Sequence, residues 1–363
     1  MFTSERSYVL FCLMMLLILV TPATAQQSQW SKFTGNPILS PGAWNPGGSL
    51  RPRVLYDGTT FRMWYSGLDM NGNLVGIGYA TSSDGSVWVA NAQPVLLASS
   101  GNWEGNYISV GSVLWNGSVF TMYYRGVGGQ TGSVEANGAV GLATSPDGVT
   151  WTKYSGNPVM RATSSVDSEF LSAPYVIQTS GSYKMWYTCK NPLLAQYAIC
   201  YASSSDGKTW SKNSSPVLTS ASGWESLGVY SPSVIFDGTT YGMWYTAEGQ
   251  TKFSSVGYAT SKDGLTWARN INNPLLSNGP AAWDQGGVEN QCVIQHNNGY
   301  FLYYDGFGMG RNVLGGGKGT LDIGMAKSPA SFVLPELNPS VTVLVSLLVA
   351  SATILFCRKQ QKK

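Results

Sequence analysis

Short runs rich in Val, Ile, Tyr, Trp and Thr alternate along the chain with clusters of Gly, Asn, Asp and Pro. Between residues 229 and 270 four such runs follow one another, and Asp-Gly pairs separate the first from the second and the third from the fourth. Apolar runs of this length between turn residues are typical of β-strands, and an Asp-Gly pair between two of them indicates a hairpin. The pattern predicts a unit of four antiparallel strands.

The same unit recurs along the chain with a period of roughly 60 residues. The turns between the third and fourth runs read SSDGSVW (82–88), SPDGVTW (145–151), SSDGKTW (204–210) and SKDGLTW (261–267). A second marker stands upstream of each copy, at Trp44, Trp103, Val166, Trp224 and Trp283. Five copies of a four-stranded unit predict an all-β fold, a five-bladed β-propeller.

The repeat also predicts how the ring closes. The blades cover about residues 42–95, 101–160, 164–218, 222–276 and 281–334. The last copy has no Asp-Gly-x-x-Trp segment, whereas residues 30–39 match residues 151–160 of the second copy. We expect residues 30–39 to supply the outer strand of the final blade, which leaves only short, protected sheet edges.

Both ends of the chain have the composition of targeting segments. Residues 1–25 combine Arg6, an apolar run and Ala23-Thr24-Ala25, as in a secretory signal peptide, and residues 26–334 form the propeller. Residues 341–357 are uncharged and precede a basic tail, so residues 335–363 are expected to anchor the chain by one C-terminal membrane helix. The Pro335-Glu336-Leu337 triplet also resembles sorting tails that exosortases cut. Either reading places the propeller on the outer face of the membrane or in the cell envelope.

Composition narrows the function classes. The chain has 363 residues, 43% hydrophobic and 11% charged, which suits a turn-rich β protein rather than disorder. Without the terminal segments its charges nearly balance, so nothing indicates nucleic-acid binding. Cys189 and Cys200 lie on neighbouring predicted strands and are expected to form a disulfide outside the cell. Cys292 is expected to be a buried thiol, and His296, the single histidine, to lead into a turn.

The inner strands and the Trp-acid markers resemble the five-bladed propeller superfamily of arabinanases, levansucrases and invertases, which includes glycoside hydrolase families 43 and 32. The resemblance spans about residues 30–334 and implies a central funnel with catalytic carboxylates at the starts of the inner strands. Family motifs are Asp-Pro-x-Val on early blades and Glu-Gly-Pro on a later one. The equivalent strands here read LRPRV (50–54), SVGSV (109–113), SAPYV (172–176), YSPSV (230–234) and ENQCV (289–293). The family Asp is therefore replaced in every blade, and Glu289 alone matches the family Glu.

Residues that break the repeat are the candidates for chemistry. Glu289, Asp305 and Glu169 depart from the repeat at the funnel mouth and are the catalytic candidates, since glycoside hydrolysis uses two carboxylates about 5 to 10 Å apart. Solvated or Arg-paired carboxylates are the alternative.

Four further residues are the candidates for substrate binding: Arg51, Arg125, Tyr230 and Asp284. The arginines are equally suited to neutralising the acids. Asp284 shares its repeat position with Glu104, Asp167 and Glu225, a position suited to capping an interblade loop.

Two functions remain open. The first is a cell-surface, glycoside-hydrolase-like protein that acts on an oligosaccharide or polysaccharide in an acidic funnel. The second is a non-catalytic propeller that binds glycans or envelope partners, because the family motifs are not intact. Carbohydrate and, through the C-terminal helix, the membrane are the expected partners. No metal site or cofactor is predicted, and the resemblance leaves open a structural calcium ion like that of some relatives.

Overall fold

The computed structural model describes residues 30–100, 103–128, 138–162, 166–250, 253–297, 299–309 and 321–328. These residues form an all-β structure with one short 3₁₀ turn, η1 (Gly223–Glu225). The predicted signal peptide (1–25) and anchor (335–363) lie outside the described residues. In the part of the chain that the structure describes, no helix is long and apolar enough to cross a membrane.

The strands form five units, called blades 1 to 5, in each of which neighbouring strands pair antiparallel. The first strands are β2 (Gly48–Tyr56), β6 (Tyr107–Trp115), β11 (Phe170–Thr179), β15 (Gly228–Phe236) and β19 (Gly287–His296). The second strands are β3 (Phe61–Leu68), β7 (Phe120–Val127), β12 (Ser182–Lys190), β16 (Tyr241–Glu248) and β20 (Gly299–Phe307). The third strands are β4 (Leu74–Ser82), β8 (Ala139–Ser145), β13 (Ala198–Ser204), β17 (Ser254–Ser261) and β21 (Leu321–Ser328).

The outermost strands are only two residues long. They are β5 (Val89–Ala90), β9 (Thr152–Lys153), β14 (Ser211–Lys212), β18 (Ala268–Arg269) and β1 (Ser31–Lys32). Blade 2 has one more short strand, β10 (Met160–Arg161), which pairs with β8. Short outer strands leave little unpaired backbone at the rim, which protects the blades from edge-to-edge pairing.

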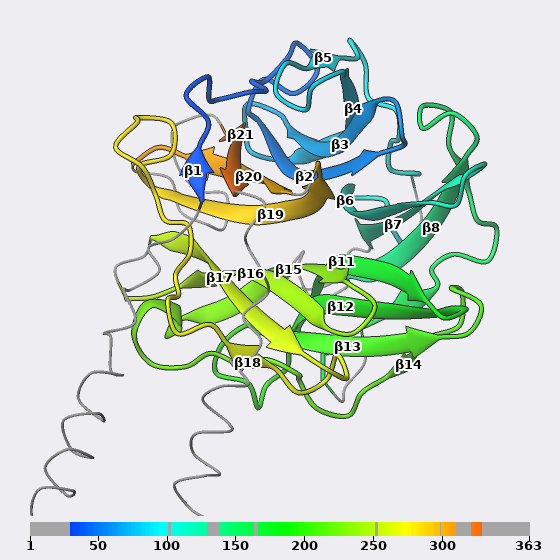
Figure 1. The fold of residues 1–363 in the computed structure, drawn as a ribbon. Coiled ribbons are helices and arrows are strands. Elements are labelled where there is room, and N and C mark those ends of the chain that lie inside the picture. Colours follow the sequence, from blue (N-terminus) through cyan, green and yellow to red (C-terminus); the bar gives the residue numbers. More distant parts are fainter. Residues whose placement is uncertain are drawn as a thin grey trace, which may run out of the picture.

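The five first strands surround the centre of the molecule. Each of β2, β6, β11, β15 and β19 contacts the next, and β19 contacts β2. In Figure 1 the blades follow one another around this ring in chain order, from blue β2 to orange β21. The architecture is therefore propeller-like, with the start of each first strand on the same face as the end of the second.

The strand pairing expected for residues 30–39 is observed. Ser31 pairs with Lys327 and Lys32 with Ala326, so β1 is the outer strand of blade 5. Leu39 forms a further antiparallel bridge with Ile323. The N-terminal segment thus belongs to the same blade as β21.

The hydrophobic core is divided among the junctions between blades. Five clusters of buried side chains each join two neighbouring blades. At the junction of blades 5 and 1, for example, Met63 and Phe61 pack with Tyr303 and Met325. Because each blade completes the core of both neighbours, its repeated apolar residues stabilise the ring rather than an isolated sheet.

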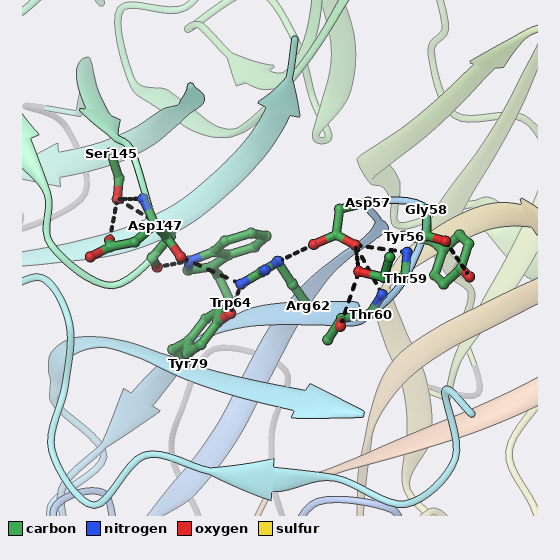
Figure 2. A network of polar contacts seen from close by, with 11 residues as sticks. Tyr56, Asp57, Gly58, Thr59, Thr60, Arg62, Trp64, Tyr79, Ser145 and Asp147 are labelled. Carbon is green, nitrogen blue, oxygen red and sulfur yellow. Dashed lines mark hydrogen bonds and ion pairs between the residues drawn. The ribbon is translucent and has the colours of Figure 1, made fainter. Parts of the chain in front are cut away.

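The Asp-Gly turns also connect blades, as Figure 2 shows for blades 1 and 2. Asp147 accepts backbone hydrogen bonds from the two residues after Gly148, and Trp64 of blade 1 donates its indole N–H to the Gly148 carbonyl at 2.8 Å. Tyr123, Trp186 and Tyr303 donate in the same way to Gly207, Gly264 and Gly85. The Met-Trp-Tyr runs and the Asp-Gly turns are therefore two halves of one interblade contact.

The cysteine and histidine predictions have direct counterparts in the structure. Cys189 on β12 and Cys200 on β13 form a disulfide. Cys292 is a buried free thiol. His296 ends β19 and contacts the rings of Tyr56 and Phe61, which places it in an aromatic cluster rather than in a catalytic triad.

Candidate functional site

A β-bulge interrupts the first strand of every blade at the same place. The register with the second strand shifts between Leu50 and Arg53 and at the equivalent positions of the other blades. The bulged residues Arg51, Ala173, Ser231 and Asn290 have φ between 46° and 55°. A non-glycine residue in this region costs about 1 to 3 kcal/mol and is typical of functional sites. These are the positions at which the family carries Asp.

The second strand of the preceding blade holds the bulges of blades 1, 2, 4 and 5 in place. The N–H of Val110 donates to Ser66 Oγ at 3.1 Å, and that of Ser231 donates to Thr188 Oγ1 at 2.9 Å. Asn290 N–H donates to Thr246 in the same way. At the bulge of blade 1 the acceptor is a carboxylate, because Arg51 N–H donates to Asp305 Oδ1 at 2.9 Å. Asp305 therefore occupies a repeat position that holds Ser or Thr in three other blades.

Asp305 lies directly opposite Glu289. The two residues are cross-strand partners on β20 and β19, next to the bulge. Asp305 is fully buried, and its second oxygen accepts a hydrogen bond from Asn290 Nδ2 at 2.8 Å. Glu289 is 4% exposed and accepts a hydrogen bond from the Tyr230 hydroxyl at 3.3 Å. The structure thus brings together two of the three predicted catalytic carboxylates, and Glu289 is the less completely buried of the two.

Burial makes this pair retain a proton. Desolvation raises the pKa of Glu289 well above its ordinary value, and the neighbouring charge of Asp305 raises it further, against the opposing effects of Arg51 and Tyr230. Burial also raises the pKa of Asp305 to about 6, although the hydrogen bonds from Asn290 and Arg51 N–H lower it. Because both Asp305 oxygens accept hydrogen bonds, Asp305 is the ionised member and Glu289 holds the proton.

Arg51 reaches across the start of the ring. Its Nη1 donates to Ser109 Oγ of β6 at 3.0 Å and to Ser172 Oγ of β11 at 3.4 Å. Ser109, Ser172, Tyr230 and Glu289 hold the same repeat position, one residue before the bulge. Arg51 Nε is buried and has no hydrogen-bond partner among the described residues. The guanidinium therefore brings a positive charge and one open hydrogen-bond donor to the layer of side chains next to the bulges, which includes Tyr230 and Glu289.

Arg125 and Tyr230, predicted to bind substrate, also lie in this part of the ring. Arg125 occupies the repeat position of Asp305 in blade 2, donates to Tyr107 Oη at 2.8 Å and stacks over the Phe170 ring at 4.7 Å. Burial and the nearby Glu289 raise the pKa of Tyr230 well above its ordinary value, so its hydroxyl stays a hydrogen-bond donor. Both side chains are held rigidly, which suits ligand contacts.

The structure places Asp284 elsewhere. Asp284 is 1% exposed and forms an ion pair with Lys32 at 2.6 Å. Glu104, Asp167 and Glu225 form the equivalent pairs with Lys153, Lys212 and Arg269. Each pair connects the entrance of a blade to an outer strand, β1 in the case of Asp284. The prediction that Asp284 binds substrate is therefore corrected: it is a structural acid.

Glu169, the third catalytic candidate, lies directly before the first strand of blade 3, β11, and is partly exposed to solvent. Its side chain is 44% exposed and its carboxylate is 3.6 Å from Lys190 Nζ. No contact with Glu289 or Asp305 is present among the described residues. A solvated ion pair of this kind is the alternative that the sequence left open, and the structure supports it for Glu169.

A buried arginine lies where the first strands converge. The Arg53 guanidinium donates to the carbonyls of Gly111 on β6 and Asn290 on β19 and faces the ring of Tyr175 on β11. Among the described residues, no group of three or more His, Cys, Asp or Glu side chains is placed to hold a metal ion. A calcium ion prefers a shell of oxygen ligands, and here a fixed cation already uses the main-chain oxygens. These residues do not fit a central calcium site.

The sequence did not identify Asn290 or Arg53 as parts of this layer. Asn290 connects Asp305 to Ser231, whose hydroxyl donates to Asn290 Oδ1 at 2.5 Å. Aligning the second strands of the five blades would have shown that Asp305 replaces Ser or Thr. No comparable signal distinguishes Arg53, because its role follows from the position of the bulge.

Comparison with known proteins identifies relatives among carbohydrate-active enzymes. Residues 55–227 match the model of the glycosyl hydrolases family 32 N-terminal domain, and residues 191–311 match a family 130 model described as β-1,4-mannooligosaccharide phosphorylase. An uncharacterized protein of Mycobacterium tuberculosis is 31% identical over 271 residues, covering 71% of this chain and 88% of its own. The β-1,2-mannobiose phosphorylase of Thermoanaerobacter sp. is 34% identical over 98 residues, 23% of this chain and 32% of that enzyme.

Solved structures share the fold over most of the chain. A glycoside hydrolase superposes with a TM-score of 0.64 at 18% identity, covering 82% of this chain and 93% of the other. A structure from the GH130 family of mannoside phosphorylases, described with hydrolases that target β-1,2 mannosidic linkages in Candida mannan, superposes with a TM-score of 0.59 at 16% identity. It covers 83% of this chain and 93% of its own.

Proposed function

Since the chain belongs to the superfamily of five-bladed β-propeller glycoside hydrolases and phosphorylases, we propose that it cleaves a glycosidic bond of an oligosaccharide, with Glu289 as the proton donor. The observation that carries this proposal is the buried Glu289–Asp305 pair, which keeps one proton near neutral pH. Cleavage of a glycosidic bond needs an acid that protonates the leaving oxygen, and burial beside a carboxylate is an established way to keep that acid protonated.

Asp305 acts on the reaction through Glu289. Its charge favours the protonated form of Glu289, and its hydrogen bonds fix the bulges of β2 and β19. Because Asp305 is fully buried, it is a positioning residue and not the nucleophile. Tyr230 holds one oxygen of Glu289, so the proton lies on the other.

As the nucleophile, phosphate suits the site better than water. Activating water requires a second accessible carboxylate as base, and Asp305 has both oxygens engaged. Hydrogen phosphate is already anionic and needs no such base. Its oxygen would bond to the anomeric carbon while Glu289 protonates the leaving sugar oxygen, and the proton of the phosphate would restore Glu289. Arg51 and Arg125 supply positive charge to this layer.

β-Mannosides are the substrates to test first. The family 130 match covers residues 191–311, which include Tyr230, Glu289 and Asp305. The names of the matched phosphorylases specify β-1,4 and β-1,2 mannosidic substrates. We therefore propose a β-linked manno-oligosaccharide as the substrate class.

The test is a substrate screen with and without inorganic phosphate. β-1,2- and β-1,4-mannobiose and mannotriose are incubated with the protein, and sugar 1-phosphate and free reducing sugar are measured separately. We expect phosphate-dependent formation of sugar 1-phosphate by the native chain and none by Glu289→Gln. Turnover that needs no phosphate would show hydrolysis instead. Absence of turnover on a wide oligosaccharide panel, or full activity of Glu289→Gln, would refute the proposal.

One observation favours a second function, glycan binding without cleavage. Arg51 stands at a position where the family carries Asp, and its side chain reaches Ser109 and Ser172 across the ring. An arginine in this place is suited to binding hydroxyl groups and not to transferring protons. Saturable binding of a manno-oligosaccharide without product formation would support this second function.

We also propose that the propeller functions outside the cell, attached to the membrane or envelope. The apolar segments within residues 1–25 and 341–357 support this location. The Cys189–Cys200 disulfide is consistent with an oxidising compartment. Fractionation of cells, followed by protease accessibility of the propeller in intact cells, tests the location.

A further inference from the structure

A groove lies between the outer edges of blades 2 and 3, on the rim of the ring. It has a volume of about 650 Å³ and is lined by side chains of the outer strand of blade 2 and of the Asp-Gly turn of blade 3. Tyr154, Arg161, Lys208 and Trp210 belong to this lining. The residues proposed above for proton transfer do not contribute to it.

Two of these side chains, Arg161 and Lys208, break the repeat at the same groove. Tyr154 takes the place of Asn91, Asn213 and Asn270, and blade 5 also has an aromatic residue there, Phe33. Arg161 replaces Leu97, Thr219, Ser277 and Ser40. Lys208 replaces Ser86, Val149 and Leu265. Independent departures from a repeat that meet in one groove are not required by the propeller architecture, which is built without them at the other junctions.

The side chains combine aromatic faces with positive charge. Lys208 Nζ lies 5.1 Å from the centre of the Tyr154 ring, which holds the ammonium at the groove. Arg161 and Lys208 are exposed. Neither Arg161 nor Lys208 forms an ion pair among the described residues. Aromatic rings beside unneutralised cations suit a ring-shaped ligand that carries negative charge.

Trp210 adds an unsatisfied donor. The equivalent Trp88, Trp151 and Trp267 each donate the indole N–H to the glycine carbonyl of their own turn, at 3.0 to 3.2 Å. The Trp210 Nε1 is buried and has no hydrogen-bond partner among the described residues. A buried donor without a partner is costly, so the turn of blade 3 lacks a stabilising contact that three other blades have.

We propose that this groove is a second carbohydrate-binding site, which takes an oligosaccharide bearing anionic groups. Tyr154 and Trp210 provide stacking surfaces for sugar rings, and Arg161 and Lys208 bind the carboxylate or sulfate. The site lies outside the ring of first strands, so it would hold an acidic polysaccharide against the propeller while the funnel remains free.

The test is calorimetric titration of the intact chain with three probes. These are tri-galacturonic acid, its fully methyl-esterified and therefore neutral form, and a sulfated heparin tetrasaccharide. We expect an acidic probe to bind at least about 10-fold more tightly than the neutral ester, since charge-assisted hydrogen bonds are lost on esterification. Equal or tighter binding of the galacturonate shows that a carboxylate is sufficient, and tighter binding of the heparin fragment shows that sulfate adds to the affinity. Equal affinity for acid and ester, or no binding of any probe, would overturn the proposal.

Variants that restore the repeat serve as controls for folding. Arg161→Thr and Lys208→Ser introduce the residues of other blades. Together they are expected to lower the affinity for the acidic probe by about 10-fold or more. Lys262→Ser removes a lysine from the Asp-Gly turn of blade 4 and should leave affinity unchanged. Glu289→Gln should also leave it unchanged, which separates this site from the proposed function. Unaltered binding by the double variant would overturn the proposal.

Discussion

Two sets of buried acids occur in this propeller, and they differ in what surrounds them. Glu104, Asp167, Glu225 and Asp284 recur at one repeat position, and each is paired with a Lys or Arg of an outer strand. Glu289 and Asp305 occur once, face each other, and have no salt-bridge partner among the described residues. The difference teaches that the repeated acids link strands around the ring, whereas the unrepeated pair, which has no cation paired with it, is the one that we propose keeps a proton for catalysis.

The largest effect is expected at Glu289. Replacing it by Gln removes the proton donor while preserving its shape, and loss of a general acid lowers the rate by about 100-fold or more. The measurement is kcat/KM for the manno-oligosaccharide identified in the screen. Glu169→Gln, which changes a solvent-exposed carboxylate, should alter kcat/KM by less than about 3-fold. A larger loss for Glu169→Gln than for Glu289→Gln would reverse the assignment.

The next effect is one of stability and concerns the repeated acids. Glu225 forms an ion pair with Arg269, whose Nε lies 2.6 Å from the carboxylate, and it accepts a hydrogen bond from the Tyr245 hydroxyl at 3.1 Å. Glu225→Gln should lower the free energy of unfolding by about 2 kcal/mol, between the values for exposed and fully buried pairs. Urea unfolding measures the change, and Glu169→Gln, whose side chain is 44% exposed, is the matched control with a change below about 0.5 kcal/mol. If the two variants are equally stable, the repeated ion pairs do not hold the blades.

A pH experiment separates Asp305 from Glu289. Asp305→Asn removes the charge that raises the pKa of Glu289 but retains an acceptor for Arg51 N–H. An acid catalyst loses its proton as pH rises through its pKa, so a lower pKa moves the alkaline limb of the kcat/KM profile to lower pH. We expect a shift of about one pH unit, equivalent to about 1.4 kcal/mol. An unchanged or rising alkaline limb would show that Asp305 does not act through Glu289.

The smallest effect is expected at the interblade turns. Tyr303→Phe removes only the hydroxyl that donates to Gly85 O at 2.9 Å between blades 5 and 1. Tyr123→Phe removes the equivalent bond to Gly207 between blades 2 and 3. Each should lower the free energy of unfolding by about 1 kcal/mol. Similar values would show that the junction that closes the ring, between blades 5 and 1, depends on this bond no more than the junction of blades 2 and 3 does. A much larger loss for Tyr303→Phe would contradict this.

The repeat made most of the fold predictable, because strand order, turns and the pairing of β1 with β21 follow from residues that recur. Departures from the repeat also pointed to Glu289 and Asp305. Their contact was less predictable. Continuing the register of Cys292 and Tyr303 without a bulge would place Gly306 opposite Glu289, and the extra residue of the bulge brings Asp305 there instead. Composition and spacing do not encode such a shift.

Asp284 and Arg53 are two further residues whose roles could not be predicted from the sequence. Asp284 lies near the start of a first strand, as a funnel acid should, yet its charge is neutralised by Lys32, which is 252 residues away in the sequence. Arg53 resembles any polar strand residue until the carbonyls of two other blades are seen around it. Both roles depend on contacts between distant segments, which local patterns do not specify.

The most direct test of the account is the protonation state of Glu289. The protein is labelled with ¹³C at glutamate carboxyl carbons, the Glu289 signal is assigned by its absence from Glu289→Gln, and its chemical shift is followed from pH 4 to pH 8. We predict that Glu289 remains protonated at pH 6, where an ordinary glutamate is ionised. A Glu289 signal that is already ionised at pH 5 would contradict the proposal that this pair stores the proton for catalysis.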